Sequence, residues 1–239
     1  MSNSFSQNNT LPKVIFLDAM GTLFGLKTSV GEIYQQYALK HGVRADAHEI
    51  DRAFIESFKS APPLAFSVTK LTALEEQEFN WWKNVVRVTF LKLNLIEKFD
   101  SFTDFFSDIY NYFATKDPWL VFPDVVPALN RWQSKSIELG VISNFDTRLN
   151  GILKALELEQ FFTSITISSE AGFAKPDPHI FEIALNKHGF IAQQAWHIGD
   201  SFTEDCQGAK QAGIRAFCLN RDSSSLKIED WLPNLSSLG

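Results

Sequence analysis

The sequence predicts an α/β protein with a Rossmann-like, doubly wound parallel sheet and an inserted bundle of four helices. Two observations carry this prediction. From about residue 119 onward, short apolar runs alternate with segments of helical spacing, which is the pattern of a parallel sheet covered by helices on both faces. Residues 29 to 115, in contrast, contain four amphipathic stripes and no strand pattern, although a buried-strand pattern precedes them.

Composition fits a globular protein and argues against several classes of partner. The 239 residues are 45% hydrophobic and 21% charged, with a net charge of −6 and no run of Lys and Arg. We therefore expect neither nucleic acid nor a membrane as a partner. No apolar run approaches the ~20 residues that span a bilayer. Cys206 and Cys218 give no zinc pattern and no disulfide framework, so we expect a reducing, cytoplasmic location.

The first element is a buried strand at residues 14–17, Val-Ile-Phe-Leu, which ends at Asp18. Gly21 then permits a turn. Open α/β sheets bind their ligands at the carboxyl ends of such strands, so Asp18 is placed where a functional carboxylate would stand. An aspartate is also a common turn residue, and taken alone Asp18 fits that role better.

The next segment consists of four amphipathic helices. The capping-box patterns Ser29-x-x-Glu32 and Thr72-x-x-Glu75 predict two of the helix starts. Many of the chain's 22 Phe and 6 Trp residues lie here at helical spacing, which a bundle core explains. We divide the chain into a disordered tail at 1–11, an α/β core at 12–26 and 116–239, and a helical domain at 27–115.

The remaining elements alternate between helix and strand. They are a helix at 125–135, a strand at 137–142, a helix at 149–156, a strand at 164–167, a helix at 180–188, a strand at 195–198, a helix at 203–212 that Gly213 ends, and a strand at 214–219. Because the first strand must join this sheet, the helical domain is an insertion between its first and second strands.

Polar residues follow the strands, and parallel strands place their carboxyl ends at one edge of a sheet. The polar residues expected to converge there are Asp18, Ser143, Asn144, Lys175, Asp200 and Asp205. Carboxylates, a lysine and small donors together indicate a site for Mg²⁺ and a phosphoryl group, with Asp18 as a nucleophile. Separately, each residue also fits a local role, such as a helix start or a solvated loop charge.

These residues resemble the four ordered motifs of the haloacid dehalogenase (HAD) superfamily. The motifs are Asp18-Ala-Met-Gly-Thr22-Leu23, Ser143-Asn144, Lys175-Pro176 and Gly199-Asp200-Ser201-Phe-Thr-Glu-Asp205. The resemblance covers almost the whole chain, and family members with a helical C1-type cap insert it between the first and second motifs. The sequences Trp81-Trp82 and Ile142-Ser-Asn-Phe-Asp146 are most similar to the branch named after haloacid dehalogenase-like hydrolase domain-containing protein 3.

The resemblance implies a role for each residue, with Mg²⁺ as the cofactor and a small phosphorylated molecule as the substrate. Asp18 would be the nucleophile and a metal ligand. Lys175 would hold Asp18 and the phosphoryl group, and the helical cap would select the substrate. The other implied roles are metal binding by Asp200 and the backbone carbonyl of Met20, support of the metal by Asp205, and substrate binding by Thr22, Ser143 and Asn144.

The sequence departs from the family pattern at Met20. Phosphatases of this family usually carry a second aspartate two residues after the nucleophile, where it protonates the leaving group and activates water. The thioether of Met20 can do neither, and losing general acid–base catalysis typically costs ~10²–10⁴ in rate. The backbone carbonyl at this position is still available to a metal.

Three hypotheses follow from this departure. The chain is a Mg²⁺-dependent phosphohydrolase for leaving groups that need little protonation, such as acyl or aryl phosphates, with Asp146 or Glu204 as candidate replacement acids. Alternatively, it is an L-2-haloacid dehalogenase, because halide leaves without a proton, although Asp200 would repel an anionic haloacid. As a third possibility, it is a weak or inactive member that binds a phosphorylated ligand or a protein partner.

Overall fold

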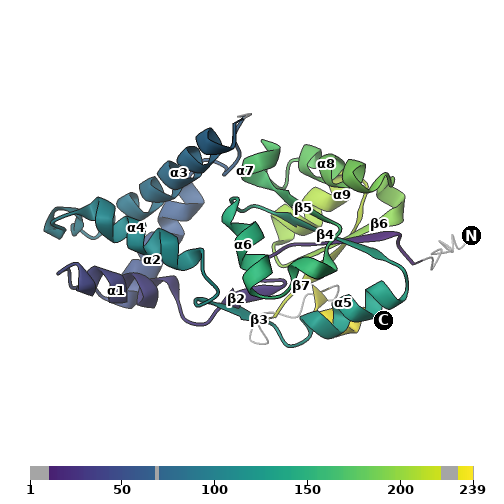
Figure 1. Ribbon diagram of the computed structural model, residues 1–239, viewed down its shortest axis with the longest axis horizontal. Coiled ribbons are helices and arrows are strands. Elements are labelled where there is room, and N and C mark those ends of the chain that lie inside the picture. The colour runs from purple at the N-terminus through teal and green to yellow at the C-terminus, as the bar shows by residue number, and fades with distance from the viewer. Residues whose placement is uncertain (1–10, 68–69, 222–230, 239) are drawn as a thin grey trace, which may run out of the picture.

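The computed structural model describes residues 11–67, 70–221 and 231–238. Its centre is a six-stranded sheet in the order β5-β4-β1-β6-β7-β8 (Figure 1). Every neighbouring pair in this sheet is parallel, which confirms the predicted fold class. The strands are β1 Val14–Leu17, β4 Glu138–Ser143, β5 Ser164–Ile167, β6 Ala195–Gly199, β7 Arg215–Leu219 and β8 Trp231–Leu232.

Strand β1 lies between β4 and β6, and its four residues are fully buried. Ile15 and Leu17 pack into the core beneath α5 (Val125–Ser134) and α6 (Arg148–Ala155). Val14 and Phe16 face the opposite core, beneath α8 (Pro178–His188) and α9 (Gly208–Gln211). Burial on both faces explains why this strand is a continuous apolar run rather than an alternating one.

The segment inserted between β1 and β4 forms a helical bundle with its own aromatic core, at the left of Figure 1. Its helices are α1 Val30–Lys40, α2 Ala47–Ser60, α3 Leu71–Lys92 and α4 Phe102–Phe113, with a short 3₁₀ turn, η1, at Ile96–Lys98. The capping box of Ser29 and Glu32 is present. The second predicted box is wrong, because the N-cap of α3 is Lys70, two residues before Thr72, and Thr72 lies inside the first turn.

Two short strands connect the bundle to the sheet. β2 (Phe24–Leu26) and β3 (Trp119–Val121) pair antiparallel where the chain enters and leaves the bundle (Figure 1). Three-residue strands are too short to produce a periodic pattern, so they were not predicted. The domain boundaries assigned from the sequence remain a prediction.

The segment after β5 begins with the short helix α7 (Ser168–Ala171) and continues to α8 (Pro178–His188). The helix predicted at 203–212 is present but divided. Residues Phe202–Gln207 form a π-helical turn, η4, and Gly208–Gln211 form α9. Gly213 follows with a φ of +75°, a conformation that suits glycine at a helix end.

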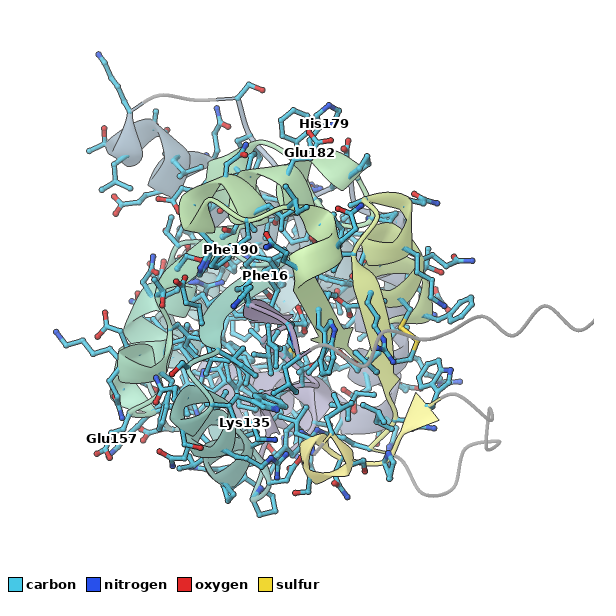
Figure 2. All side chains as sticks on the ribbon, turned by 90° about the vertical axis from the view of Figure 1, so that its right-hand side faces the viewer. Phe16, Lys135, Glu157, His179, Glu182 and Phe190 are labelled. Atoms are coloured by element: carbon cyan, nitrogen blue, oxygen red, sulfur yellow. A yellow bond between two sulfur atoms is a disulfide. The ribbon has the colours of Figure 1, made fainter. Side chains whose placement is uncertain are left out.

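The two cysteines are joined in a disulfide between η4 and β7, drawn as a yellow bond in Figure 2. The expectation of no disulfide was therefore wrong, and the cysteines no longer argue for a reducing compartment. The pairing depends on β7 returning beside η4, which residue spacing alone does not show. The tail predicted at 1–11 falls almost wholly outside the described residues. Among those that are described, no helix combines the length and the apolar character needed to cross a membrane.

Candidate active site

The carboxyl ends of three neighbouring strands bring Asp18, Ser143 and Asp200 to one edge of the sheet. Asp18 follows β1 and is only 7% exposed. The Ser143 hydroxyl, at the end of β4, donates to Asp18 Oδ1 at 3.1 Å. The strand ends therefore converge as parallel topology requires.

Lys175 lies at the centre of this cluster. Its side chain is almost fully buried, and its Nζ donates to Asp18 Oδ1 at 2.6 Å and to Asp205 Oδ1 at 2.5 Å. Asn144 positions the loop that carries the lysine, because its amide Nδ2 donates to the Lys175 carbonyl and its Oδ1 accepts from the Lys175 N–H. The lysine is thus a fixed cation beside Asp18 rather than a solvated loop charge.

Both carboxylate oxygens of Asp205 have hydrogen-bond partners. Besides the bond from Lys175, it accepts a hydrogen bond from the backbone N–H of Ser201 at 3.0 Å and pairs with His197 Nε2 at 2.8 Å. Gly199 permits this close approach, since a Cβ there would lie 2.1 Å from the Asp205 carboxyl carbon. His197 was not predicted as part of the site. The pattern that indicates it is a polar residue inside an otherwise apolar strand.

Gly21 makes room for Asp200 in the same way. Its φ is +88°, and an added Cβ would lie 2.4 Å from an Asp200 carboxylate oxygen. Thr22 is fully buried, and its hydroxyl lies 3.5 Å from Asp200 Oδ1, at the limit of a hydrogen bond. Thr22 therefore contacts the carboxylate rather than lining the pocket described below.

One oxygen from each of Asp18, Asp200 and Asp205 lies within 4.8 Å of the others. Hard oxygen donors without Cys or His suit Mg²⁺, which takes one or two carboxylates and completes its shell with water and phosphate. Because both oxygens of Asp205 already have partners, Asp18 and Asp200 are the direct candidates. The three carboxylates and the Lys175 ammonium carry a formal charge of −2, which one divalent cation would balance.

Burial and crowding change the acidity of these carboxyl groups. Burial, reinforced by the charge of Asp205, raises the pKa of Asp18 to about 7 and that of Asp200 to about 6, against the opposing effect of Lys175. Burial also acts on Asp205, but Lys175 and His197 outweigh it and hold the pKa of that carboxyl far below its usual value. Lys175 bridges Asp18 and Asp205, so this one cation is shared by three carboxylates.

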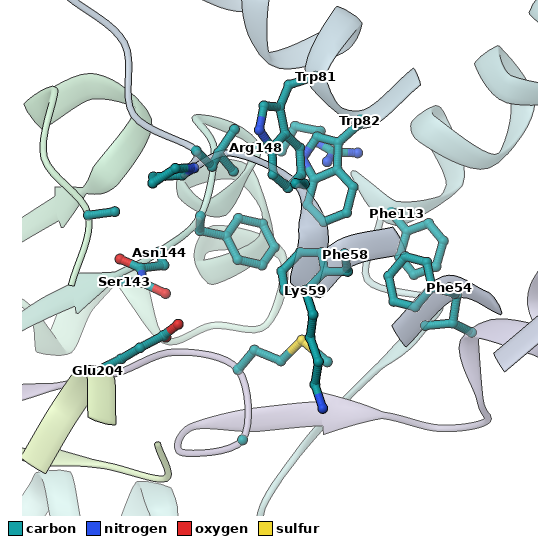
Figure 3. Close-up of a pocket in the computed structure, with 18 of the residues that line it drawn as sticks. Phe54, Phe58, Lys59, Trp81, Trp82, Phe113, Ser143, Asn144, Arg148 and Glu204 are labelled. Carbon is teal, nitrogen blue, oxygen red and sulfur yellow. The ribbon is translucent and has the colours of Figure 1, made fainter. Parts of the chain in front are cut away.

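A pocket of about 720 Å³ opens from this cluster into the helical bundle. Figure 3 shows Ser143, Asn144 and Glu204 on one side, and Phe58, Trp81 and Trp82 of α2 and α3 on the other. Met20 also lines the pocket and is 42% exposed. A ligand that reaches Asp18 through this pocket therefore passes between the sheet edge and the bundle.

Comparison with known proteins agrees with this geometry. A family model for haloacid dehalogenase-like hydrolases matches residues 12–213. The chain belongs to the haloacid dehalogenase-like hydrolase family. A Danio rerio relative, haloacid dehalogenase-like hydrolase domain-containing protein 3, is 32% identical over 212 residues, which cover 87% of this chain and 84% of the relative.

Solved structures share the fold at low sequence identity. A HAD phosphatase from Thermococcus onnurineus aligns with a TM-score of 0.65 and 19% identity over 95% of each chain. An L-2-haloacid dehalogenase from Xanthobacter autotrophicus aligns with a TM-score of 0.64 and 15% identity, covering 90% of this chain and 80% of the other. The HAD-hydrolase YfnB from Bacillus subtilis, solved with bound magnesium, has a TM-score of 0.61 and 18% identity, covering 96% and 97% of the two chains.

Within this HAD-like site, the two candidate replacements for the missing acid differ. Asp146 is fully buried and does not line the pocket, and its carboxylate accepts from Trp82 Nε1 at 2.6 Å and from Arg148 Nη2 at 2.6 Å and Nε at 2.8 Å. It serves the packing of the bundle against α6. Glu204 lines the pocket and is half-buried, and burial raises its pKa. Of the two, only Glu204 is placed to meet a ligand.

A second buried carboxylate joins the bundle to the HAD-like core. Glu78 of α3 is fully buried and accepts hydrogen bonds from the Thr147 backbone N–H at 3.0 Å and from the hydroxyls of Thr147 and Ser169 at 2.5 Å each. This contact was not predicted, because the sequence of a long amphipathic helix does not distinguish a buried glutamate from a solvent-exposed one.

Proposed function

We propose that this hydrolase is a Mg²⁺-dependent phosphohydrolase that acts through an aspartyl-phosphate on Asp18. General acid–base catalysis is weakened because Met20 stands where the family's phosphatases usually have a second aspartate. The observation that carries the proposal is the bridge from Lys175 Nζ to Asp18 and Asp205, beside the carboxylate of Asp200. It offers a nucleophile, a fixed cation and a set of metal ligands within one cluster.

In the first step, an oxygen of Asp18 attacks the phosphorus of the substrate. The bond from phosphorus to the leaving-group oxygen breaks, and that oxygen departs with the electron pair. The Lys175 ammonium and the Ser143 hydroxyl, both within hydrogen-bond distance of Asp18, offset negative charge on the phosphoryl oxygens. Held by Asp18 and Asp200, with Asp205 in support, Mg²⁺ would neutralise part of the same charge.

In the second step, water attacks the phosphorus of the aspartyl-phosphate. The bond between phosphorus and Asp18 breaks, inorganic phosphate is released, and the proton from water passes to phosphate or to solvent. Neither step receives a proton from position 20. Leaving groups that are stable as anions, such as acyl and aryl oxygens, therefore suit this site better than alkoxides.

A second candidate is L-2-haloacid dehalogenation, which Met20 favours because halide leaves without a proton. Asp200 opposes it, since a further carboxylate beside Asp18 would repel the carboxylate of a haloacid. A third candidate is a weak or inactive member that binds a phosphorylated ligand or a protein partner. The retained cluster of Asp18, Lys175 and Asp205 speaks against loss of chemistry.

One experiment separates the three. Acetyl phosphate, 4-nitrophenyl phosphate and L-2-chloropropionate are each supplied with Mg²⁺ and, separately, with EDTA. We expect phosphate release from the first two that depends on Mg²⁺, and no chloride release. Chloride release that persists in EDTA would overturn the proposal in favour of a dehalogenase. Absence of turnover with all three compounds would favour the binding protein.

A further inference from the structure

We infer that the site takes a phosphoester whose leaving group is a flat, apolar aromatic system, held in the pocket against Phe58 and the neighbouring rings. This inference rests on the proposed phosphohydrolase function and names the substrate class of that same site. Its support is the volume of the pocket, the apolar character of the wall beyond the carboxylate cluster, and the exposed ring of Phe58.

The two ends of the pocket differ in chemistry. Most of its polar residues gather at the sheet edge, around Asp18 and Lys175, and the rest of its wall is largely hydrocarbon. Ten of the 32 lining residues carry aromatic rings. A volume of about 720 Å³ lies in the range of about 300–1,000 Å³ that small-molecule sites usually have. The space beyond the phosphoryl position is therefore large and apolar.

Phe58 is the clearest indication of what fills this space. Its ring stacks on Trp82 at 5.8 Å and on Phe54 at 5.8 Å, with interplanar angles of 25° and 27°. It nevertheless stays 43% exposed, although it lines the pocket (Figure 3). A ring of this size with much of its surface open gains stability when another apolar ring covers it.

Three polar side chains of this wall already have hydrogen-bond partners within the protein. Arg148 lines the pocket but is bound to Asp146 and to the Tyr110 carbonyl, with its guanidinium stacked 3.7 Å from the Tyr110 ring centre. The indole N–H groups of Trp81 and Trp82 donate to the Pro62 carbonyl and to Asp146. These three side chains therefore have few donors left for a sugar or a second phosphate.

Among the described lining residues, Lys59 is the cation that has no ion pair, and it is exposed on the solvent side. It does not supply a buried anion site. An aromatic leaving oxygen also agrees with Met20. A phenolate is a more stable anion than an alkoxide, so its departure needs less protonation. The pocket wall and the missing acid thus indicate the same substrate class.

The test compares 2-naphthyl phosphate with phenyl phosphate, whose leaving groups have similar acidity, and uses acetyl phosphate as a small reference substrate. We expect kcat/KM for the naphthyl ester to exceed that for the phenyl ester by about tenfold or more. In Phe58→Ala, the ratio of kcat/KM for naphthyl phosphate to that for acetyl phosphate should fall by about tenfold. Ile55→Ala is the matched control, because Ile55 lies on the same helix, is 50% exposed and does not line the pocket.

The outcomes separate this inference from the proposed function. Acetyl phosphate hydrolysis without a preference for the naphthyl ester, or with equal effects of Phe58→Ala and Ile55→Ala, would overturn the inference and leave the phosphohydrolase standing. If no phosphate is hydrolysed, binding of 2-naphthylphosphonate and phenylphosphonate is compared by tryptophan fluorescence. Tighter naphthyl binding that Phe58→Ala abolishes supports the aromatic site even then, and equal binding of the two overturns it.

Discussion

The indole Nε1 of Trp82 donates a hydrogen bond of 2.6 Å to Asp146, across 64 positions of sequence. Trp82 lies on α3 of the helical bundle, and Asp146 lies at the start of α6, just beyond the sheet edge that carries the site. Two sequence motifs far apart in the chain, Trp81-Trp82 and the segment ending at Asp146, therefore meet in space. Their meeting fixes the bundle over the entrance to Asp18.

Replacing Trp82 with Phe keeps a ring and removes the donor. Asp146 would keep its bonds to Arg148, so we expect the free energy of unfolding to fall by about 1–2 kcal/mol, measured by urea denaturation. Trp81→Phe is the matched control, because its indole donates to the Pro62 carbonyl in a more exposed contact. An equal loss in the two variants would contradict a special role for the bond to Asp146.

Glu78 gives a prediction about pH. Burial, reinforced by the charge of Asp146, raises its native pKa above the ordinary value of 4.5, against hydrogen bonds from Ser169 and Thr147. The folded state thus holds this proton more tightly than the unfolded state. The stability that Glu78 contributes is full below pH 4.5 and is lost as the pH rises through the native pKa.

Glu78→Gln should remove this dependence, since an amide can still accept from Thr147 and Ser169. We expect the stability of the variant relative to the unsubstituted protein to increase between about pH 4 and pH 7, in urea denaturation at each pH. Glu76→Gln on the exposed side of the same helix is the control. A difference that does not change with pH would show that Glu78 titrates alike in both states.

Asp18→Asn should abolish turnover of every phosphate substrate, because an amide oxygen cannot form the aspartyl-phosphate. Circular dichroism would show whether the fold is kept. Residual hydrolysis well above background would place the nucleophile elsewhere.

Met20→Asp should restore the missing acid and base. We expect hydrolysis of an unactivated alkyl phosphate to rise by up to ~10²–10⁴, with a much smaller effect on acetyl phosphate. Met20→Asn has nearly the same shape as the aspartate without its proton and serves as the control. A similar gain in both variants would attribute the effect to polarity rather than to proton transfer.

Asp200→Asn should weaken Mg²⁺ binding by about tenfold or more, measured by isothermal titration calorimetry, because it removes one of the two direct carboxylates. Glu204→Gln, a nearby carboxylate outside the cluster of three, is the comparison. If Glu204→Gln weakens binding as much as Asp200→Asn, the metal ligands have been assigned wrongly.

Much of the fold follows from local patterns. Strands buried on both faces, such as β1 and β4, are apolar runs that end in polar residues, and the topology of parallel sheets then brings Asp18 and Ser143 together. Contacts made by side chains far apart in sequence leave no such pattern. Neither Glu78 with Ser169 nor His197 with Asp205 could be paired before the packing of α3 and the turn after β6 were known.

The start of α3 and the disulfide also could not be predicted from local sequence patterns. Thr72 has the spacing of a capping box, but α3 begins after Lys70, and no side chain among the described residues caps this start. The two cysteines are twelve positions apart, and only the return of β7 beside η4 brings them together.

The β2–β3 pair has a mechanical consequence. The two chain segments that join the bundle to the sheet are hydrogen-bonded to each other, so the covalent connection runs through one two-stranded pair. Glu78 and Trp82, whose side chains hydrogen-bond to the α/β core, lie on α3. Figure 1 shows α3 on the opposite side of the bundle from the β2–β3 pair. Separating α3 from the sheet edge would therefore break the hydrogen bonds of Glu78 and Trp82 without parting β2 from β3.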